Sequence, residues 1–346
     1  IYRQILYRGN KLMYRSLKTK MTLGIGLLSL MMLLVFTYFT YFQVNDSILT
    51  AEQRNYELIS ETIQSDMDNQ FHMAELALIP IVNDLEIQEA FAKGDRDFLI
   101  NKMKSTYDDL ESMGIFSLQF NLPPATVFLR LQNLELYNDD VSTIRSSMVK
   151  ANNDKSRVIG LEEGKLGYAF RVLLPISYEN EFIGTVESGM SLSDEFLNRI
   201  KQKIPGEYFV YNFPKENGES TMLSGTIDED LFSISEDILE KAKTDSKMQY
   251  VHSDDKGESI LILPFKDYNG ETKGYIKVIL SREDTLAKLS EFNTRIGILI
   301  AVSIIIVLTL VYLLARSFSN PINDATSIAV NLASGNFTNN IPTKHL

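Results

Sequence analysis

Two arginines in predicted strands are the side chains best suited to bind a small ligand. In residues 166–174, alternation places Arg171 on the same face as two small residues, which leaves space in front of its guanidinium. In residues 126–132, Arg130 shares a face with the ring of Phe128. Arginine keeps its charge when it is covered, so it requires an anion, and a carboxylate can accept from two of its nitrogens. The two strands therefore predict a site for a small organic anion.

The predicted ligand site combines charged and aromatic side chains. Arg130 and Arg171 would hold a carboxylate, and aromatic rings would form the walls. The predicted ligand-binding residues are Arg130, Arg171, Phe128, Tyr168, Tyr137 and Glu187. The alternative is that the two arginines pair with carboxylates of the chain itself. The acidic side chains available for such pairing are Asp140, Glu162 and Glu187.

No residue pattern in the chain predicts an enzyme. The adjacent acidic pairs at 139–140 and 162–163 would point to opposite faces of a strand, so neither pair converges on a substrate. Asp140 is better explained as the N-terminal cap of a helix predicted over residues 141–151. The histidines are too scattered for a metal motif, and there is no phosphate-binding glycine loop, so we expect no metal and no cofactor. The histidines are His72, His252 and His345.

Two long uncharged segments predict the elements that anchor the molecule. Residues 21–45 and 296–315 carry no charged side chain, and twenty helical residues cover the hydrocarbon core of a bilayer. The first segment ends in aromatic residues typical of a membrane interface. This ending favours an uncleaved span over the alternative of a retained signal sequence. The lipid bilayer is therefore an expected partner.

Charge is unevenly distributed along the 346 residues. The formal net charge is −11, yet residues 1–20 carry six basic and no acidic side chains. Basic flanks around an acidic centre predict a multi-pass protein of the plasma membrane, with residues 46–294 outside the cytoplasm. The acidic centre argues against a nucleic-acid partner, which requires a basic face. The chain has no cysteine, which excludes disulfides.

The sequence pattern of residues 46–294 predicts a long helix followed by two similar lobes. Apolar residues recur at mostly three- and four-residue steps between positions 49 and 78, and Pro80 interrupts that run. The segment containing Pro175 and Gly184 is repeated at Pro264 and Gly274, each time as two strands joined by a turn. The expected parts are a basic cytoplasmic N-terminus (1–20), a first transmembrane helix (21–45), a long helix (46–84), a membrane-distal lobe (85–203), a membrane-proximal lobe (204–283), a linker helix (284–295), a second transmembrane helix (296–315) and a C-terminal segment (316–346).

The lobes are predicted to be α+β, with antiparallel sheets and helices segregated to one side. A helix is expected over residues 99–110, capped by Asp95, and another over residues 235–244. The expected strands span 115–120, 126–132, 157–161, 166–176, 182–190, 207–213, 248–253, 259–266 and 273–280.

This order of elements is similar to bacterial double Cache sensor domains, which place two PAS-like lobes on a long N-terminal helix. Residues 120–124 (FNLPP), 128–130 (FLR) and 160–164 (GLEEG) match a motif series in the distal lobe of one subgroup. Members of that subgroup often carry one histidine before the L-P pair and another two residues after the arginine. In this chain those positions hold Asn121 and Gln132. The resemblance implies a sensor of small molecules. Because Asn121 and Gln132 replace the two histidines, the resemblance does not carry over the identity of the ligand.

Residues 316–346 resemble the start of a HAMP domain, a parallel four-helix bundle formed by a dimer. The resemblance rests on apolar and small residues at heptad-like steps, and Gly335 is suited to end the helix. The seam residues are Ile322, Ala325, Ala329 and Leu332. Because the chain begins at Ile1 and stops inside this motif at Leu346, we expect a fragment of a longer protein. The resemblance implies a homodimer that reaches cytoplasmic signalling partners through a further output domain.

The predicted function is a transmembrane receptor for an extracytoplasmic small molecule. The small residues that follow the second span resemble most closely a methyl-accepting chemotaxis receptor. Two alternatives remain from the sequence. One is a sensor histidine kinase or diguanylate cyclase whose catalytic domain lies beyond the residues given, and the other is a transport or cell-envelope protein with a large loop between spans.

Overall fold

The computed structural model describes residues 2–164, 167–214, 220–253 and 257–334, and for helical residues 2–23, 314–316, 318–324 and 331 it describes the backbone only. The chain divides into two compact units. One contains Ile1–Glu52 and Asp284–Leu346, and the other contains Gln53–Glu283. Predictions that involve Leu166, Gly335 and His345 lie outside the described residues, as does the predicted end of the last helix.

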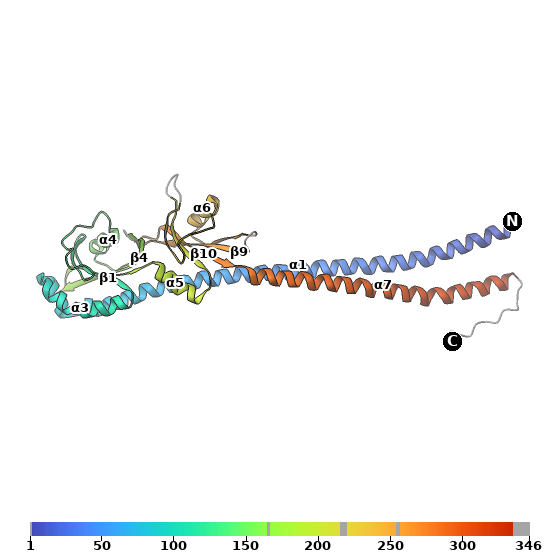
Figure 1. Cartoon of the computed structure of the whole chain (residues 1–346), viewed down its shortest axis with the longest axis horizontal. Coiled ribbons are helices and arrows are strands. Elements are labelled where there is room, and N and C mark those ends of the chain that lie inside the picture. Colours follow the sequence, from blue (N-terminus) through green and yellow to red (C-terminus); the bar gives the residue numbers. More distant parts are fainter. Residues whose placement is uncertain (1, 165–166, 215–219, 254–256, 335–346) are drawn as a thin grey trace. The chain divides into compact units, whose positions relative to one another are not determined.

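The first unit consists of parts of two long helices, α1 (Tyr2–Val82) and α7 (Glu283–Ala333) (Figure 1). Both contain a stretch that is long and apolar enough to cross a membrane, Gly24–Val82 in α1 and Glu283–Leu313 in α7. Within this unit the ring of Tyr41 stacks on that of Phe292, with 6.1 Å between centroids. Within the first unit, the large apolar side chains of both helices are mostly exposed, among them Met31 and Phe36 of α1 and Val302 and Ile305 of α7, as expected for residues that face lipid.

The second unit is built on the C-terminal part of α1, whose one face is buried under both lobes (Figure 1). The buried side chains recur at helical spacing and are Tyr56, Ile59, Ile63, Met67, Ala74, Leu78 and Ile81. The helix passes through Pro80 and ends at Val82, so the expected interruption at Pro80 is displaced by two residues. Two short helices follow, α2 (Leu85–Lys93) and α3 (Arg96–Ser112).

Side-chain caps start both short helices. The carboxylate of Asp84 accepts from the backbone N–H groups of Glu86 and Ile87 at the start of α2. Asp95 accepts from the N–H of Phe98 and caps α3, as the sequence predicts. The two caps fix where α2 and α3 begin, and the first strand follows α3.

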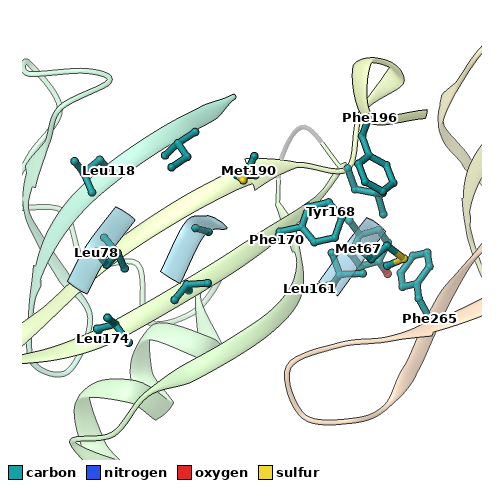
Figure 2. Packing of buried hydrophobic residues seen from close by; sticks show 14 of the residues in the cluster. Met67, Leu78, Leu118, Leu161, Tyr168, Phe170, Leu174, Met190, Phe196 and Phe265 are labelled. Atoms are coloured by element: carbon teal, nitrogen blue, oxygen red, sulfur yellow. The ribbon is translucent and has the colours of Figure 1, made fainter. Parts of the chain in front are cut away.

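The first lobe is a five-stranded antiparallel sheet in the order β2-β1-β5-β4-β3. Its strands are β1 (Ile115–Leu122), β2 (Thr126–Arg130), β3 (Val158–Gly164), β4 (Gly167–Tyr178) and β5 (Glu181–Ser191). Its inner face packs on α1, where Leu118 and Leu174 lie near Leu78, and Phe170 lies near Met67 (Figure 2). Helix α4 (Ser146–Asp154) covers the outer face over a smaller apolar group, which we call the outer cluster. The outer cluster consists of Ala125, Val127, Val141, Met148, Ala151, Val158 and Leu173.

The second lobe repeats this plan in the order β7-β6-β10-β9-β8. Helix α5 (Asp194–Lys203) connects the lobes, and α6 (Glu236–Asp245) covers the outer face of the second sheet. The strands are β6 (Glu207–Asn212), β7 (Met222–Gly225), β8 (Gln249–Ser253), β9 (Glu258–Lys266) and β10 (Thr272–Ser281). The matching strand order confirms the α+β fold with two PAS-like lobes. Strand β7 was not predicted, because four residues with a serine and a glycine have little strand signature.

Two local expectations are wrong. Helix α4 begins at Ser146 rather than at residue 141, and Asp140 caps a turn by accepting from the N–H of Ser142 at 2.8 Å. Strand β2 does not alternate regularly, because a bulge between β1 and β2 leaves Phe128 without a register partner. As a result Val127 joins the outer cluster, whereas Leu129 joins the core on the inner face.

Candidate functional site

Two arginines and two glutamates meet on the outer face of the first sheet, and we call them the charged quartet. Its members are Arg145, Glu162, Arg171 and Glu187. Arg171 lies on β4 and Glu187 on β5, in the centre of the sheet. Glu162 lies on β3, and Arg145 immediately precedes α4. All four are nearly or fully covered, so their charges interact across a poorly solvated space.

Glu187 is fully buried and forms the centre of the quartet. Its Oε1 accepts from Arg145 Nη2 at 2.6 Å and from Arg171 Nη1 at 2.8 Å, and its Oε2 accepts from Gln119 Nε2 at 3.0 Å. Burial alone raises the pKa of this carboxyl group, but the two guanidinium groups outweigh burial and hold the pKa below its ordinary value. Glu187 therefore stays ionised.

Glu162 fixes the position of Arg145. Its carboxylate accepts from Arg145 Nε at 2.8 Å, and from the N–H and Oγ of Ser147 at 2.9 and 2.6 Å. Burial lowers the pKa of Arg145, but its two carboxylate partners outweigh burial and raise that pKa above the ordinary value. The first turn of α4 is thus tied to strand β3 by a charge-assisted network.

Arg171 is the least satisfied member of the quartet. Burial and the nearby Arg145 together lower its pKa, and Glu187 only partly compensates. Its Nε is buried and has no hydrogen-bond partner among the described residues. Space for the guanidinium comes from Gly189, because a Cβ there would lie 2.4 Å from Ser117 Oγ and 3.1 Å from Arg171 Nη1. The Nε–H of Arg171 is therefore a positively charged donor that could bind an anion.

Further buried polar atoms on the same face lack a partner in the described part of the chain. They are Ser117 Oγ, both side-chain polar atoms of Asn121, and Thr185 Oγ1. Asn121 and Thr185 are register partners on neighbouring strands, and both are fully buried. An unsatisfied buried polar group costs about 1–3 kcal/mol, so this face gains stability from any occupant that can bond to it.

The structure separates the six predicted ligand-binding residues into three places. Arg171 and Glu187 lie together in the quartet, bonded to one another. Tyr168 lies on the inner face, where its ring meets the edge of Phe265 at 4.9 Å (Figure 2). Phe128 also packs toward the inner core, 5.3 Å from the ring of Phe91. These two aromatic rings do not line the space around Arg171.

Arg130 and Tyr137 are engaged by the segment that follows β2. Arg130 donates to both carboxylate oxygens of Asp139, at 2.5 and 2.8 Å, and to the carbonyl oxygen of Leu136 at 2.9 Å. This pairing lowers the pKa of Asp139. Tyr137 is 47% exposed, and the guanidinium of Arg96 lies 4.2 Å from its ring centre. The guanidinium of Arg130 is therefore paired with groups of the protein itself rather than open to a ligand.

Sequence reasoning did not place Arg145 or Gln119 in the site. Arg145 fell inside a predicted surface helix, and only the true start of α4 turns its side chain to the sheet. Gln119 shows alternation on β1 but no charge that would single it out. Among the described residues, no group of three or more histidine, aspartate or glutamate side chains is arranged to hold a metal ion.

The chain is similar, at low sequence identity, to several solved structures of sensory domains. The sensory domain of the Campylobacter jejuni chemoreceptor Tlp3, crystallised with isoleucine bound, is 16% identical, with a TM-score of 0.47, and the match covers 70% of this chain and 97% of that one. The extracellular domain of the histidine kinase vpHK1S-Z8 is 10% identical, with a TM-score of 0.47 and coverage of 70% and 95%. A domain of a sensory box/GGDEF family protein from Vibrio parahaemolyticus is 10% identical, with a TM-score of 0.47 and coverage of 70% and 98%. Similarity at this level identifies neither a ligand nor an output domain for the present chain.

The match to a protein family is more direct. No curated protein matches the sequence. However, the family model dCache_3, described as the double sensory domain of two-component sensor kinases, matches residues 49–285. That range contains α1 from its buried part onward, both sheets and the charged quartet. The chain therefore belongs to the dCache_3 family of double sensory domains.

Proposed function

We propose that this chain is a transmembrane receptor subunit whose first lobe binds a small organic molecule with a carboxylate group outside the cytoplasm. The observation that carries the proposal is the buried Arg171, whose Nε has no partner among the described residues. A carboxylate is the planar acceptor that suits a guanidinium. Ser117 Oγ and Arg171 Nη1 both lie close to Gly189, so the Ser117 hydroxyl, also unpartnered in the described part of the chain, offers a second donor beside the guanidinium.

We infer that ligand access involves movement of the segment at 131–145, because its last residue, Arg145, bonds to Glu187 in the quartet. The unpartnered atoms on this face are almost fully shielded from solvent. Two arginines tie the segment down: Arg130 through Leu136 and Asp139, and Arg96 through the carbonyl oxygen of Leu134. We infer that Arg130 controls opening of the site, whereas Arg171 contacts the ligand.

Isothermal titration of the full chain in nanodiscs against a panel of small organic acids tests this assignment. We expect at least one acid to bind, and Arg171→Gln to weaken its binding about tenfold or more, because a charge-assisted hydrogen bond is lost. The matched control is Arg157→Gln, since Arg157 is exposed and pairs with Glu75. Arg130→Gln should change affinity less than Arg171→Gln. Absence of any binding acid, or equal binding by the Arg171 and Arg157 variants, contradicts the proposal.

The proposed output passes through α7 to the cytoplasm in a homodimer. Two features support this route: α7 begins two residues after β10 ends, and it contains a stretch apolar enough to span a bilayer. We propose that residues 316–346 begin a HAMP domain and that the receptor serves chemotaxis. The family description favours a second candidate, a sensor kinase. The coding sequence beyond Leu346 separates them, since long heptads rich in Glu, Gln and Ala indicate chemotaxis and a phosphoacceptor histidine motif indicates a kinase.

A further inference from the structure

The hairpin between β9 and β10 of the second lobe touches strand β3 of the first lobe. The backbone N–H of Tyr268, at the tip of this hairpin, donates to the carbonyl oxygen of Leu161 at 3.1 Å. Asp267 forms a parallel bridge with the same residue. The side chain of Tyr268 packs against the outer cluster beneath α4. A turn of one lobe is thus seated on the sheet and helix that carry the charged quartet in the other.

Close approach of the two backbones depends on Gly160. A Cβ at this position would lie 2.3 Å from the Cα of Tyr268 and 2.7 Å from its backbone nitrogen. Its φ of 159° is also one that other residues rarely adopt, so both the close contact and the backbone conformation favour glycine here. Any larger residue would push the hairpin away from β3.

The hairpin can transmit a displacement because its turn is closed by several hydrogen bonds. The carboxylate of Asp267 accepts from the N–H groups of Asn269 and Glu271 at 2.9 and 3.0 Å. The backbone of Asp267 also bonds to Gly270 and Glu271, both at 2.9 Å. Such a turn moves as one piece with the strands it joins.

On one side this contact adjoins the charged quartet, and on the other side it leads to the start of α7. Leu161 immediately precedes Glu162, whose carboxylate holds Arg145 and Ser147. Beyond the hairpin, β10 runs to Ser281, and α7 begins at Glu283. A change in the quartet that moves β3 therefore reaches the start of α7 through one hairpin and one strand.

We propose that the Tyr268 hairpin couples the charged quartet to β10 and the start of α7. This coupling rests on the proposed function only in one respect, the identity of the ligand that would disturb the charged quartet. The lobes also meet where the ring of Tyr168 contacts Phe265 and where Asn212 Nδ2 donates to Glu163 Oε1 at 3.1 Å. The contact farthest from the hairpin in strand order is made by the edge strand β7, which β6 separates from β10: Gly225 donates its N–H to Asp194, and Ser224 Oγ donates to the carbonyl oxygen of Leu192. That junction provides a matched control.

Hydrogen exchange of the full chain in nanodiscs, followed by mass spectrometry, tests the coupling without any ligand. Glu162→Gln removes one charge from the quartet at nearly constant shape. We expect faster exchange both in β3 and in peptides covering 272–283, by about fivefold, which is the lower end of measured coupling between sites. In a Tyr268→Ala background, the same change should still accelerate β3 but leave 272–283 unaffected. In a Ser224→Ala background, the response of 272–283 should persist.

Several outcomes overturn the coupling. They are an unchanged exchange rate in 272–283 upon Glu162→Gln, a response that survives Tyr268→Ala, and a response lost equally in the Ser224→Ala background. If circular dichroism shows that Tyr268→Ala does not fold, Tyr268→Leu preserves apolar bulk while changing the contact with the outer cluster, and Gly160→Ala displaces the hairpin from β3. The coupling then requires both variants to reduce the response. Failure to find a binding acid leaves these results unchanged, so the two proposals fail separately.

Discussion

The two lobes share one sheet plan but place opposite charges at the equivalent position. Glu187 on β5 and Lys277 on β10 each follow a glycine by three residues, Gly184 in one lobe and Gly274 in the other. Both side chains lie on the outer face, and both are buried, Glu187 completely and Lys277 with 2% exposure. The difference between the lobes lies in what surrounds each charge.

In the second lobe the chain satisfies its own buried charge. Lys277 Nζ lies 2.5 Å from a carboxylate oxygen of Asp230 and also bonds to the carbonyl oxygen of Phe232. Tyr211 donates to the same Asp230 oxygen at 2.7 Å. The remaining contacts on this face are apolar and include Phe209, Ile260 and Ile262 on the sheet and Leu239 and Ala242 on α6. In the first lobe, by contrast, Arg171 Nε is buried and has no hydrogen-bond partner among the residues that the structure describes. The central charge of the second lobe is therefore paired within the chain, whereas the arginine beside Glu187 in the first lobe keeps a donor nitrogen that has no partner in the described part of the chain.

Loss of the central carboxylate in the first lobe should have the largest effect. Glu187→Ala leaves two buried guanidinium groups short of an acceptor, and breaking such a network costs about 3–5 kcal/mol. Thermal unfolding followed by circular dichroism measures the loss. Glu181→Ala, which removes an exposed carboxylate from the start of the same strand, is the control. Equal stability of the two variants contradicts the central role of Glu187.

Removal of the central cation in the second lobe should have a somewhat smaller effect, on stability alone. Lys277→Met leaves the Asp230 carboxylate buried with Tyr211 as a remaining donor, so we expect a loss of about 3 kcal/mol. The double variant Lys277→Met/Asp230→Asn should recover part of this loss, because no unpaired charge remains. Binding of an organic acid, measured by titration, should be unchanged in both. Weaker binding would show that the second lobe also takes part in recognition.

The smallest effect concerns pH. Folding lowers the pKa of Glu187 below its ordinary value of 4.5, so between the folded and unfolded pKa values the unfolded chain binds more protons. The contribution of Glu187 to stability is therefore fully present above the unfolded pKa and is lost as pH falls through the folded pKa. Melting temperatures measured between pH 3 and pH 7 should fall less steeply on the acid side in Glu187→Gln than in the parent chain. Parallel curves would show that this carboxyl group does not titrate differently upon folding.

Lys277 provides the alkaline counterpart. Burial lowers its pKa despite the pairing with Asp230, so the unfolded chain again binds more protons, now at pH values just below the ordinary 10.5. The difference in melting temperature between the parent chain and Lys277→Met should widen as pH rises through this window. The two equivalent positions thus act in separate pH ranges although they occupy the same place in their sheets.

The sequence by itself determined the elements that depend on local pattern. Helical periodicity along α1, strand alternation in β4 and β5 and the cap at Asp95 all involve neighbours a few residues apart, and the repeated Pro and Gly positions can be read by comparing two segments of the sequence. For that reason the α+β class and the two related lobes follow from the residues alone. The importance of Arg171 also follows, because a covered arginine requires an anion wherever it lies.

Only the tertiary structure decided which charges meet. Arg145 reaches Glu162 and Glu187 across 17 and 42 residues, and Lys277 reaches Asp230 across 47 residues, so no local pattern reveals these pairs. The bulge in β2 turns Phe128 to the inner core, and the loop after β2 supplies Asp139 to Arg130. Register, bulges and loop paths depend on packing between distant segments, and that packing determines which carboxylate each arginine meets.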